Sequence, residues 1–227
     1  MPLENVLFAF MLTLLAGLST GIGSAIAFFA KEFNPRFLSV SLGFSAGVMI
    51  YVSMIEIFPK AKDSLVLIHG DKLGYWLTVI SFFAGIAIIA IIDKLVPEED
   101  NPHELKDVED MQVSEEDIKK KSLLRMGMFS ALAITIHNFP EGLATFIGGL
   151  QNPALGVSIA VAIAIHNIPE GIAVSVPIYY ATGSRRKAFC LSFLSGLSEV
   201  LGALIGYFVL LRFFTESVFG IVFGVVA

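Results

Sequence analysis

The chain has 227 residues, of which 56% are hydrophobic and only 15% are charged. Soluble domains carry about 25% charged residues, so this composition excludes an ordinary soluble protein and indicates an integral membrane protein. The net charge of −5 comes mostly from one acidic segment, residues 93–117, so we expect no nucleic-acid partner, and the single Cys190 excludes an intrachain disulfide and a cysteine-based metal cluster.

Transmembrane helices are predicted wherever about 20 apolar residues follow one another, because this length crosses the hydrocarbon core. The six predicted spans are residues 5–29, 38–58, 74–93, 123–148, 154–181 and 188–211. The tail that follows is too short to span, so we expect the chain to end within a seventh helix. The fold class is therefore all-α, a polytopic transmembrane bundle in which residues 1–227 form a single domain.

The distribution of basic residues predicts the orientation in the membrane. The loops after the first, third and fifth spans hold most of the lysines and arginines, and cytoplasmic loops are enriched in these residues. We therefore expect the N-terminus outside, a charged cytoplasmic loop at 94–122 and a location in the cell (inner or plasma) membrane. His103 in this loop, and His69 and Asp93 elsewhere, are interpreted as loop or interfacial residues.

Two copies of one polar motif interrupt the apolar spans. HNFPEG occupies residues 137–142 and HNIPEG occupies residues 166–171, near the middle of two consecutive helices, and Glu199 lies near the middle of the next. An ionisable group at this depth costs at least about 2.5–3.5 kcal/mol. Since no lysine or arginine lies at that depth, a bound cation is the simplest compensation.

The spacing within each motif supports a metal site. A histidine and a glutamate four residues apart share one helix face, so two such faces can surround one ion. The asparagines add neutral oxygens, and a second ion fits beside the first if both motif glutamates bridge and Glu199 contributes. Imidazole and carboxylate ligands suit Zn²⁺, Fe²⁺, Mn²⁺, Co²⁺ or Cd²⁺ and argue against Cu(I). The predicted metal ligands are His137, Asn138, Glu141, His166, Asn167, Glu170 and Glu199.

Prolines and glycines in the spans predict local backbone features. Pro140 and Pro169 lack the helical hydrogen-bond donor, so both helices are expected to break there and line a path or a cavity. Gly142 and Gly171 should allow a neighbouring helix to approach closely. The pairs Gly43 with Gly47, and Gly202 with Gly206, have the spacing of close helix contacts.

Other interpretations of the same residues are open at this point. A membrane-embedded metalloenzyme would use the same histidine and glutamate cluster, although neither HExxH nor the Glu-x-x-His spacing of di-iron bundles is present. A structural membrane protein without metal would require the three central carboxylates to be protonated and hydrogen-bonded. Glu56, at the outer end of the span 38–58, either lines an entrance or reaches to the interface.

The doubled motif, together with GLSEVLG at residues 196–202, resembles the ZIP (Zrt-, Irt-like protein) metal transporters, most closely their bacterial ZupT-like branch. The resemblance also covers SLGFSAGVMIYVSMIEIFP in the span 38–58 and YYATGSRRKA at residues 179–188. It implies eight transmembrane helices, both termini outside, and a binuclear metal site between the helices that carry the two motifs, with the seven residues above as ligands.

The resemblance further implies a transporter and not an enzyme, which imports zinc and other divalent metals, including iron and manganese, into the cytoplasm. These ions are its cargo, no prosthetic group is expected, and its other partners are the lipid bilayer and, as an option, a second copy in a homodimer. Relative to the family, the chain is expected to be incomplete at its C-terminus. Asn167 stands where some members have an acidic residue, which would make the second site less negative.

Overall fold

The computed structural model describes residues 2–27, 29, 35–95, 115–213 and 215–227. Within these ranges the chain is helical and contains no strand, so the all-α fold class is confirmed. The elements are α1 (Leu3–Ala27), α2 (Pro35–Tyr51), the π-helix η1 (Val52–Ile57), α3 (Phe58–Leu95), α4 (Glu115–Gln151), α5 (Pro153–Thr182), α6 (Arg185–Gly196), α7 (Ser198–Phe208), the 3₁₀-helix η3 (Leu210–Phe213) and α8 (Glu216–Val226).

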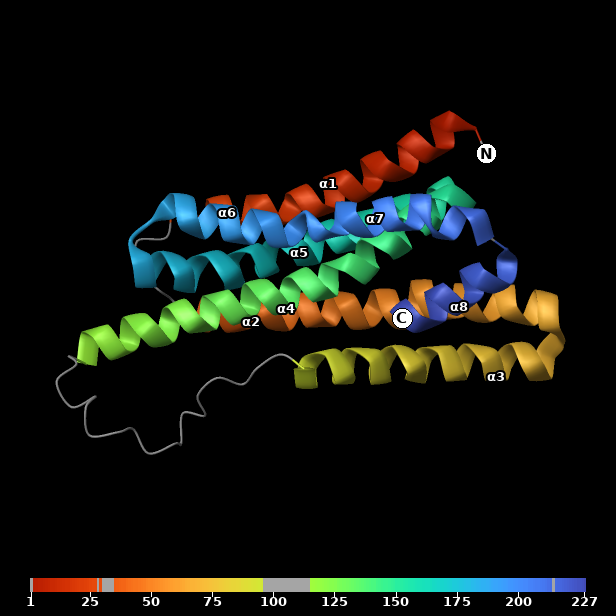
Figure 1. Ribbon diagram of the computed structural model, residues 1–227, viewed down its shortest axis with the longest axis horizontal. Coiled ribbons are helices and arrows are strands. Elements are labelled where there is room, and N and C mark those ends of the chain that lie inside the picture. Colours follow the sequence, from red (N-terminus) through yellow and green to blue (C-terminus); the bar gives the residue numbers. More distant parts are fainter. Residues whose placement is uncertain (1, 28, 30–34, 96–114, 214) are drawn as a thin grey trace.

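Most helix boundaries lie within a few residues of the predicted spans, but two helices are longer. The second span was predicted to end at residue 58, whereas helix continues through η1 and into α3 as far as Gly70. Gly70 has φ 76°, a conformation that residues with a side chain rarely adopt, and the chain reverses there (Figure 1). Apolar length locates the part of a helix inside the membrane, whereas the helix itself ends where the backbone turns.

The second longer helix is α4, which begins at Glu115 instead of the predicted 123. Charged residues before the apolar run continue the same helix, because lysine and glutamate are good helix formers. Residues 96–114, which include most of the predicted loop 94–122 and His103, lie outside the described residues.

Among the residues that the structure describes, four helical segments are long and apolar enough to cross a membrane: 3–26, 39–91, 153–182 and 185–208. The second of these contains the reversal at Gly70, so it supplies two crossings. Helix α4 is long enough to cross a membrane, but it is less apolar than these four segments because it begins with several charged residues and also carries the polar motif. Helix α8 is a shorter apolar helix. These features are those of a polytopic membrane bundle.

The helices pack in two groups (Figure 1). Helices α1, α4, α5, α6 and α7 contact one another, whereas α2, η1, α3 and α8 form the second group. The most extensive contact between the groups is that of α2 with α5. Both motifs therefore lie in the first group, and α5 carries its motif on the helix that also faces α2.

Local signals define the ends of α5, which positions the second motif. The Asn152 side chain accepts hydrogen bonds from the backbone N–H groups of Ala154 (2.9 Å) and Leu155 (3.3 Å). Pro153 occupies the first helical position, where its missing N–H is not needed. Gly183 ends the helix in the left-handed conformation, with φ 66°.

Candidate metal site

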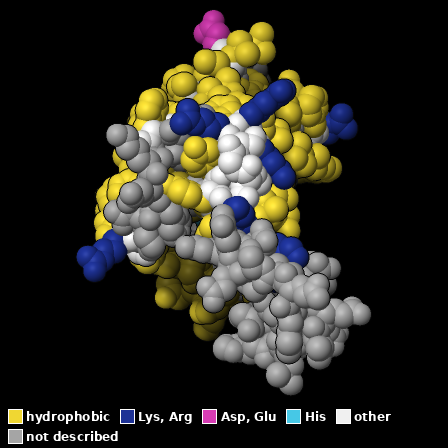
Figure 2. Space-filling view, turned by 90° about the vertical axis from the view of Figure 1, so that its left-hand side faces the viewer, with side chains coloured by type: hydrophobic (Ala, Val, Ile, Leu, Met, Phe, Trp, Pro, Cys, Tyr) yellow, Lys and Arg dark blue, Asp and Glu magenta, His cyan; other side chains and the backbone are white. Residues whose placement is uncertain are grey.

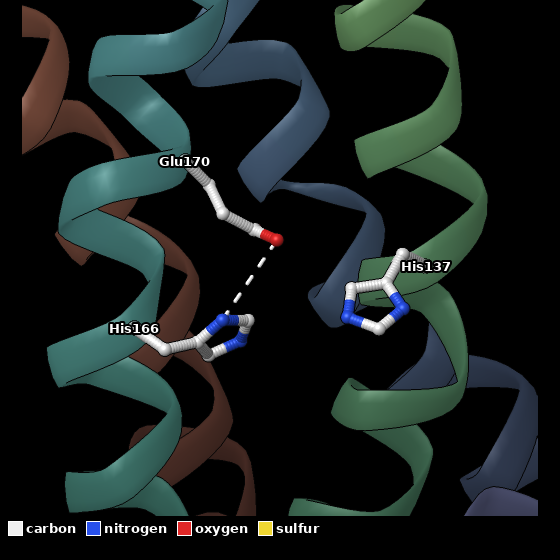
Figure 3. Close-up of side chains that lie close together, drawn as sticks. All are labelled: His137, His166 and Glu170. Atoms are coloured by element: carbon white, nitrogen blue, oxygen red, sulfur yellow. Dashed lines mark ion pairs between the residues drawn. The ribbon is translucent and has the colours of Figure 1, made fainter. Parts of the chain in front are cut away.

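The two motifs lie on neighbouring helices, α4 and α5, and face each other. His137 and Glu141 project from α4, and His166 and Glu170 project from α5. Figure 3 shows the side chains of His137, His166 and Glu170 pointing into the space between these two helices. The predicted meeting of two histidine and glutamate faces is therefore present in the fold.

Glu141 joins the two histidines. Its Oε1 atom lies 3.1 Å from Nε2 of His137, one turn earlier on α4, and its Oε2 atom lies 3.1 Å from Nε2 of His166 on α5. One carboxylate therefore contacts an imidazole from each helix. Such an arrangement holds two ring nitrogens near a common centre, which is the geometry that a shared cation requires.

Glu170 and the two imidazoles form a compact donor set. Glu170 Oε1 lies 3.8 Å from Nδ1 of His166, and one ligand atom from each of His137, His166 and Glu170 can be chosen so that all lie within 4.8 Å of one another. The two imidazole rings are 6.0 Å apart at an interplanar angle of 88°. Two nitrogens and one oxygen at this separation are suited to a divalent cation of the first transition series.

The carboxylates of the cluster are almost completely removed from solvent. Glu141 and Glu170 are 4% and 8% exposed, and Glu199 and His166 are fully buried. Within the part of the chain that the structure describes, Glu141 and Glu170 form ion pairs with histidines alone. Buried charges without a compensating cation are strongly unfavourable, so this site is electrostatically prepared for positive charge.

The other three predicted residues, Asn138, Asn167 and Glu199, differ in where they lie relative to the cluster. In the amide orientation that pairs donors with acceptors, Asn138 donates to Oε2 of Glu170 (3.2 Å) and to the carbonyl oxygen of Ile134 (3.3 Å). Asn167 donates to the carbonyl oxygen of Ala16 (2.9 Å) and to Oε1 of Glu199. Asn138 therefore lies beside the cluster, whereas Asn167 and Glu199 form a separate buried pair next to α1.

Glycines bring the helices around the site into backbone contact. A Cβ atom at Gly142 would overlap the carbonyl oxygen of Glu199 on α7, and one at Gly202 would overlap that of Phe139 on α4. The close approach predicted for Gly142 is confirmed, and Gly171 packs in the same way against Thr20 of α1. The contact predicted for Gly43 with Gly47 is wrong, because a Cβ atom at either would meet no described atom within 4 Å.

The prolines do not break the helices as predicted. Helix α4 continues through Pro140, and α5 continues through Pro169 and Pro177. Packing of neighbouring helices on both sides keeps the backbone helical although each proline removes one donor. Irregular backbone occurs elsewhere, in the π-helix η1 and at Leu197, where α6 passes into α7 two residues before Glu199.

A cavity of about 520 Å³ opens beside the cluster, between α2, α4 and α5. His137, His166 and Glu170 line it, and His137 has 46% of its side chain exposed. The α2 wall includes Ser45, which lies 3.2 Å from Nδ1 of His166 and was not among the predicted site residues. Its only sequence signal is a serine within an apolar span, which is common in transmembrane helices.

Two other candidates from the sequence lie away from this cluster. Glu56 is half-buried in η1, and its two interpretations stay predictions. His69 is exposed and its Nε2 atom lies 2.9 Å from the hydroxyl oxygen of Ser217, at the end of the bundle where α8 begins. This contact agrees with the interfacial role expected for His69.

Comparison with known proteins decides the class of protein that carries this cluster. The family described as ZIP Zinc transporter matches residues 94–226, which is more than half of the chain and includes both motifs. The chain belongs to the ZIP zinc transporter family. Membership in a family of transporters decides against the metalloenzyme alternative, and it agrees with the resemblance indicated by the doubled motif.

Curated ZIP relatives are similar to this chain over almost its whole length. The chain is 67% identical over 224 residues to the zinc transporter ZupT of Chlorobium chlorochromatii and 66% identical over 224 residues to that of Chlorobaculum parvum. It is 62% identical over 236 residues to the zinc transporter ZupT of Clostridium perfringens. Each of these comparisons covers 99% of this chain and 83% of the relative.

Proposed function

We propose that this ZIP protein imports zinc across the cell membrane through the cluster between α4 and α5. The observation that carries the proposal is the Glu141 carboxylate, which is buried and contacts one imidazole from each of these helices. A zinc ion bound here would replace the contacts between Glu141 and the two imidazoles by coordination bonds, and its charge would neutralise the buried carboxylate. Iron, manganese, cobalt and cadmium are further cargo, since they accept the same nitrogen and oxygen ligands.

The proposal includes a second ion beside the first. Asn167 and Glu199 are fully buried, and neither Asn167 Oδ1 nor Glu199 Oε2 has a hydrogen-bond partner among the described residues. Buried acceptors without donors attract a cation or water. In this proposal Glu141 and Glu170 lie between the two ions, Asn138 and Asn167 add neutral oxygens, and Glu199 binds the second ion from α7.

The distribution of charge supports an orientation with the N-terminus outside. Figure 2 shows the end of the bundle at which α5 ends and α6 begins, where lysine and arginine side chains are spread around an apolar body. Arg185, Arg186 and Lys187 lie there in an exposed segment, as do Lys120 and Lys121 near the start of α4. By the positive-inside rule, this end and the segment 94–122 face the cytoplasm.

The cavity supports a direction for release. Its α4 wall includes Ser130, Ala133 and Ile134, which precede His137 on the way to the basic end of the helix. Zinc would bind from the outside, and movement of the group that contains α4 and α5 against α2 would open and close access to the cluster. Release into the cytoplasm would then use the cavity that His137 lines.

The experiment that tests this function is ⁶⁵Zn²⁺ uptake into proteoliposomes containing the full chain. We expect saturable zinc influx, and we expect His137→Ala to abolish it. Glu4→Gln is the control, because Glu4 is exposed near the start of α1 and is not part of the site, so influx should be unchanged. Competition by unlabelled Fe²⁺, Mn²⁺, Co²⁺ and Cd²⁺ measures which other metals share the route. Uptake that persists unchanged in His137→Ala would disprove the site, and the absence of influx into vesicles with the unaltered chain would disprove the function.

A further inference from the structure

Ser45 reaches from α2 to the second motif on α5. The residue is 5% exposed, and its hydroxyl oxygen lies 3.2 Å from Nδ1 of His166 and 3.2 Å from the backbone carbonyl oxygen of His166. Of the α2 residues that line the cavity, the others are Leu42, Ala46, Met49 and Ile50, which are all apolar. Ser45 is therefore the polar side chain that this wall presents to the cluster.

The two contacts of the hydroxyl determine what it offers to the imidazole. A serine hydroxyl has one hydrogen to donate and two lone pairs to accept with. Its hydrogen is donated to the carbonyl oxygen of His166. A lone pair then faces Nδ1, and this hydrogen-bond network assigns a hydrogen to Nδ1, which donates to Ser45.

The remaining nitrogen of the same ring points to the centre of the cluster. Nε2 of His166 is 3.1 Å from Oε2 of Glu141, on the side of the ring opposite to Ser45. A metal binds only an imidazole nitrogen that carries no hydrogen. Without an ion, Nε2 is hydrogen-bonded to the carboxylate of Glu141. Zinc would take the place of the Nε2 hydrogen, while Nδ1 keeps the hydrogen that it donates to Ser45.

We propose that Ser45 is a positioning residue of the metal site, whose hydroxyl fixes the His166 ring so that zinc is bound through Nε2. The proposal rests on the proposed function, because it concerns the same ion. It also makes α2 part of the site, although α2 belongs to the other group of helices, so that the correct histidine geometry depends on α2 lying against α5.

Loss of the Ser45 hydroxyl would remove the hydrogen-bond acceptor of His166 Nδ1. A carboxylate oxygen, Oε1 of Glu170, lies 3.8 Å from this nitrogen. Without Ser45 the ring would turn toward Glu170, so Nδ1 and Nε2 would compete for the ion and Glu170 would be drawn from its own ligand position. Removing a hydrogen-bond partner of a metal-binding histidine typically weakens metal affinity by about 10–100-fold.

The test measures zinc affinity and ring chemistry in the full chain purified in detergent. In zinc-loaded protein labelled with ¹⁵N-histidine, we expect the His166 signal, assigned by its loss in His166→Gln, to show hydrogen on Nδ1 and zinc on Nε2. Calorimetry of Ser45→Ala should show affinity reduced about 10–100-fold. Ser45→Thr, which retains the hydroxyl, should restore it, and Ser41→Ala, one turn earlier and outside the cavity lining, should match the unaltered protein.

Zinc on Nδ1 of His166 in the unaltered protein would overturn the proposal without any variant. Unchanged zinc affinity and an unchanged His166 spectrum in Ser45→Ala would also overturn it, while leaving the transport function intact. An unaltered protein that binds no zinc would instead refute the proposed function. The two failures are therefore distinguishable.

Discussion

Gly142→Ala is the substitution whose effect the structure predicts most directly. Alanine is the better helix former by about 1 kcal/mol, so propensity alone would make the variant more stable. The added methyl group, however, would overlap the backbone carbonyl oxygen of Glu199 on α7. A backbone atom cannot turn aside as a side chain does, so α4 and α7 must separate.

The size of the effect follows from these opposing contributions. Overpacking a close contact costs about 1–3 kcal/mol, and here it also separates the Gly202 backbone from Phe139 across the same crossing. We expect a net destabilisation of up to about 2 kcal/mol after the propensity gain. For a chain of this size, such a change lowers Tm by up to roughly 8 °C. Because the separation displaces Glu199, binding of a second zinc ion should weaken as well.

The assay is thermal unfolding in detergent, with Gly47→Ala as the matched control. Gly47 is also a helical glycine, but a Cβ atom there meets no described atom within 4 Å, so alanine should stabilise α2 by up to about 1 kcal/mol. The two variants therefore shift Tm in opposite directions. A Gly142→Ala protein as stable as Gly47→Ala would refute the argument that backbone contact between α4 and α7 holds the site together.

Three further outcomes test the site and the helix that supports it. Equilibrium dialysis should show two zinc ions per unaltered chain and one in Glu199→Gln. One ion in the unaltered chain would contradict the second ion, and two ions in Glu199→Gln would contradict Glu199 as its ligand. Zinc at about 100 times its Kd should stabilise the fold by about 2.7 kcal/mol, which is measured as a rise in Tm. Glu141→Gln lacks the carboxylate that contacts both imidazoles, so most of the zinc-induced rise in Tm should be lost in this variant. Asn152→Ala removes two cap hydrogen bonds and should destabilise α5 by about 1 kcal/mol in chemical denaturation. Asn152→Ser, which keeps a capping oxygen, is the matched control and should retain most of the stability.

The sequence predicts the residues of the cluster better than their contacts. The i, i+4 spacing within each motif places His137 with Glu141 and His166 with Glu170, and both pairs are present. It does not predict that Glu141 contacts both imidazoles. The cross-helix distance depends on how far α4 and α5 are rotated and shifted against each other, which their apolar composition leaves open.

Asn138 and Asn167 illustrate the same limit. They occupy equivalent positions in the two motifs, yet Asn138 lies beside Glu170, whereas Asn167 is bound to α1 and Glu199. Their surroundings differ because Asn167 lies against Ala16 of α1, whereas Asn138 lies against Ser195 of α6. The two halves of a repeated sequence therefore have unequal roles in three dimensions.

Composition and contacts within one helix are enough to predict the membrane class, the helices and the polar residues that enter their apolar faces. They do not predict which glycines touch a neighbour, that the helices continue through Pro140 and Pro169, or that Ser45 of α2 reaches His166. The physical reason is that side chains from distant segments meet according to helix rotation, depth and separation. In an apolar bundle, these are set by packing at a few close contacts.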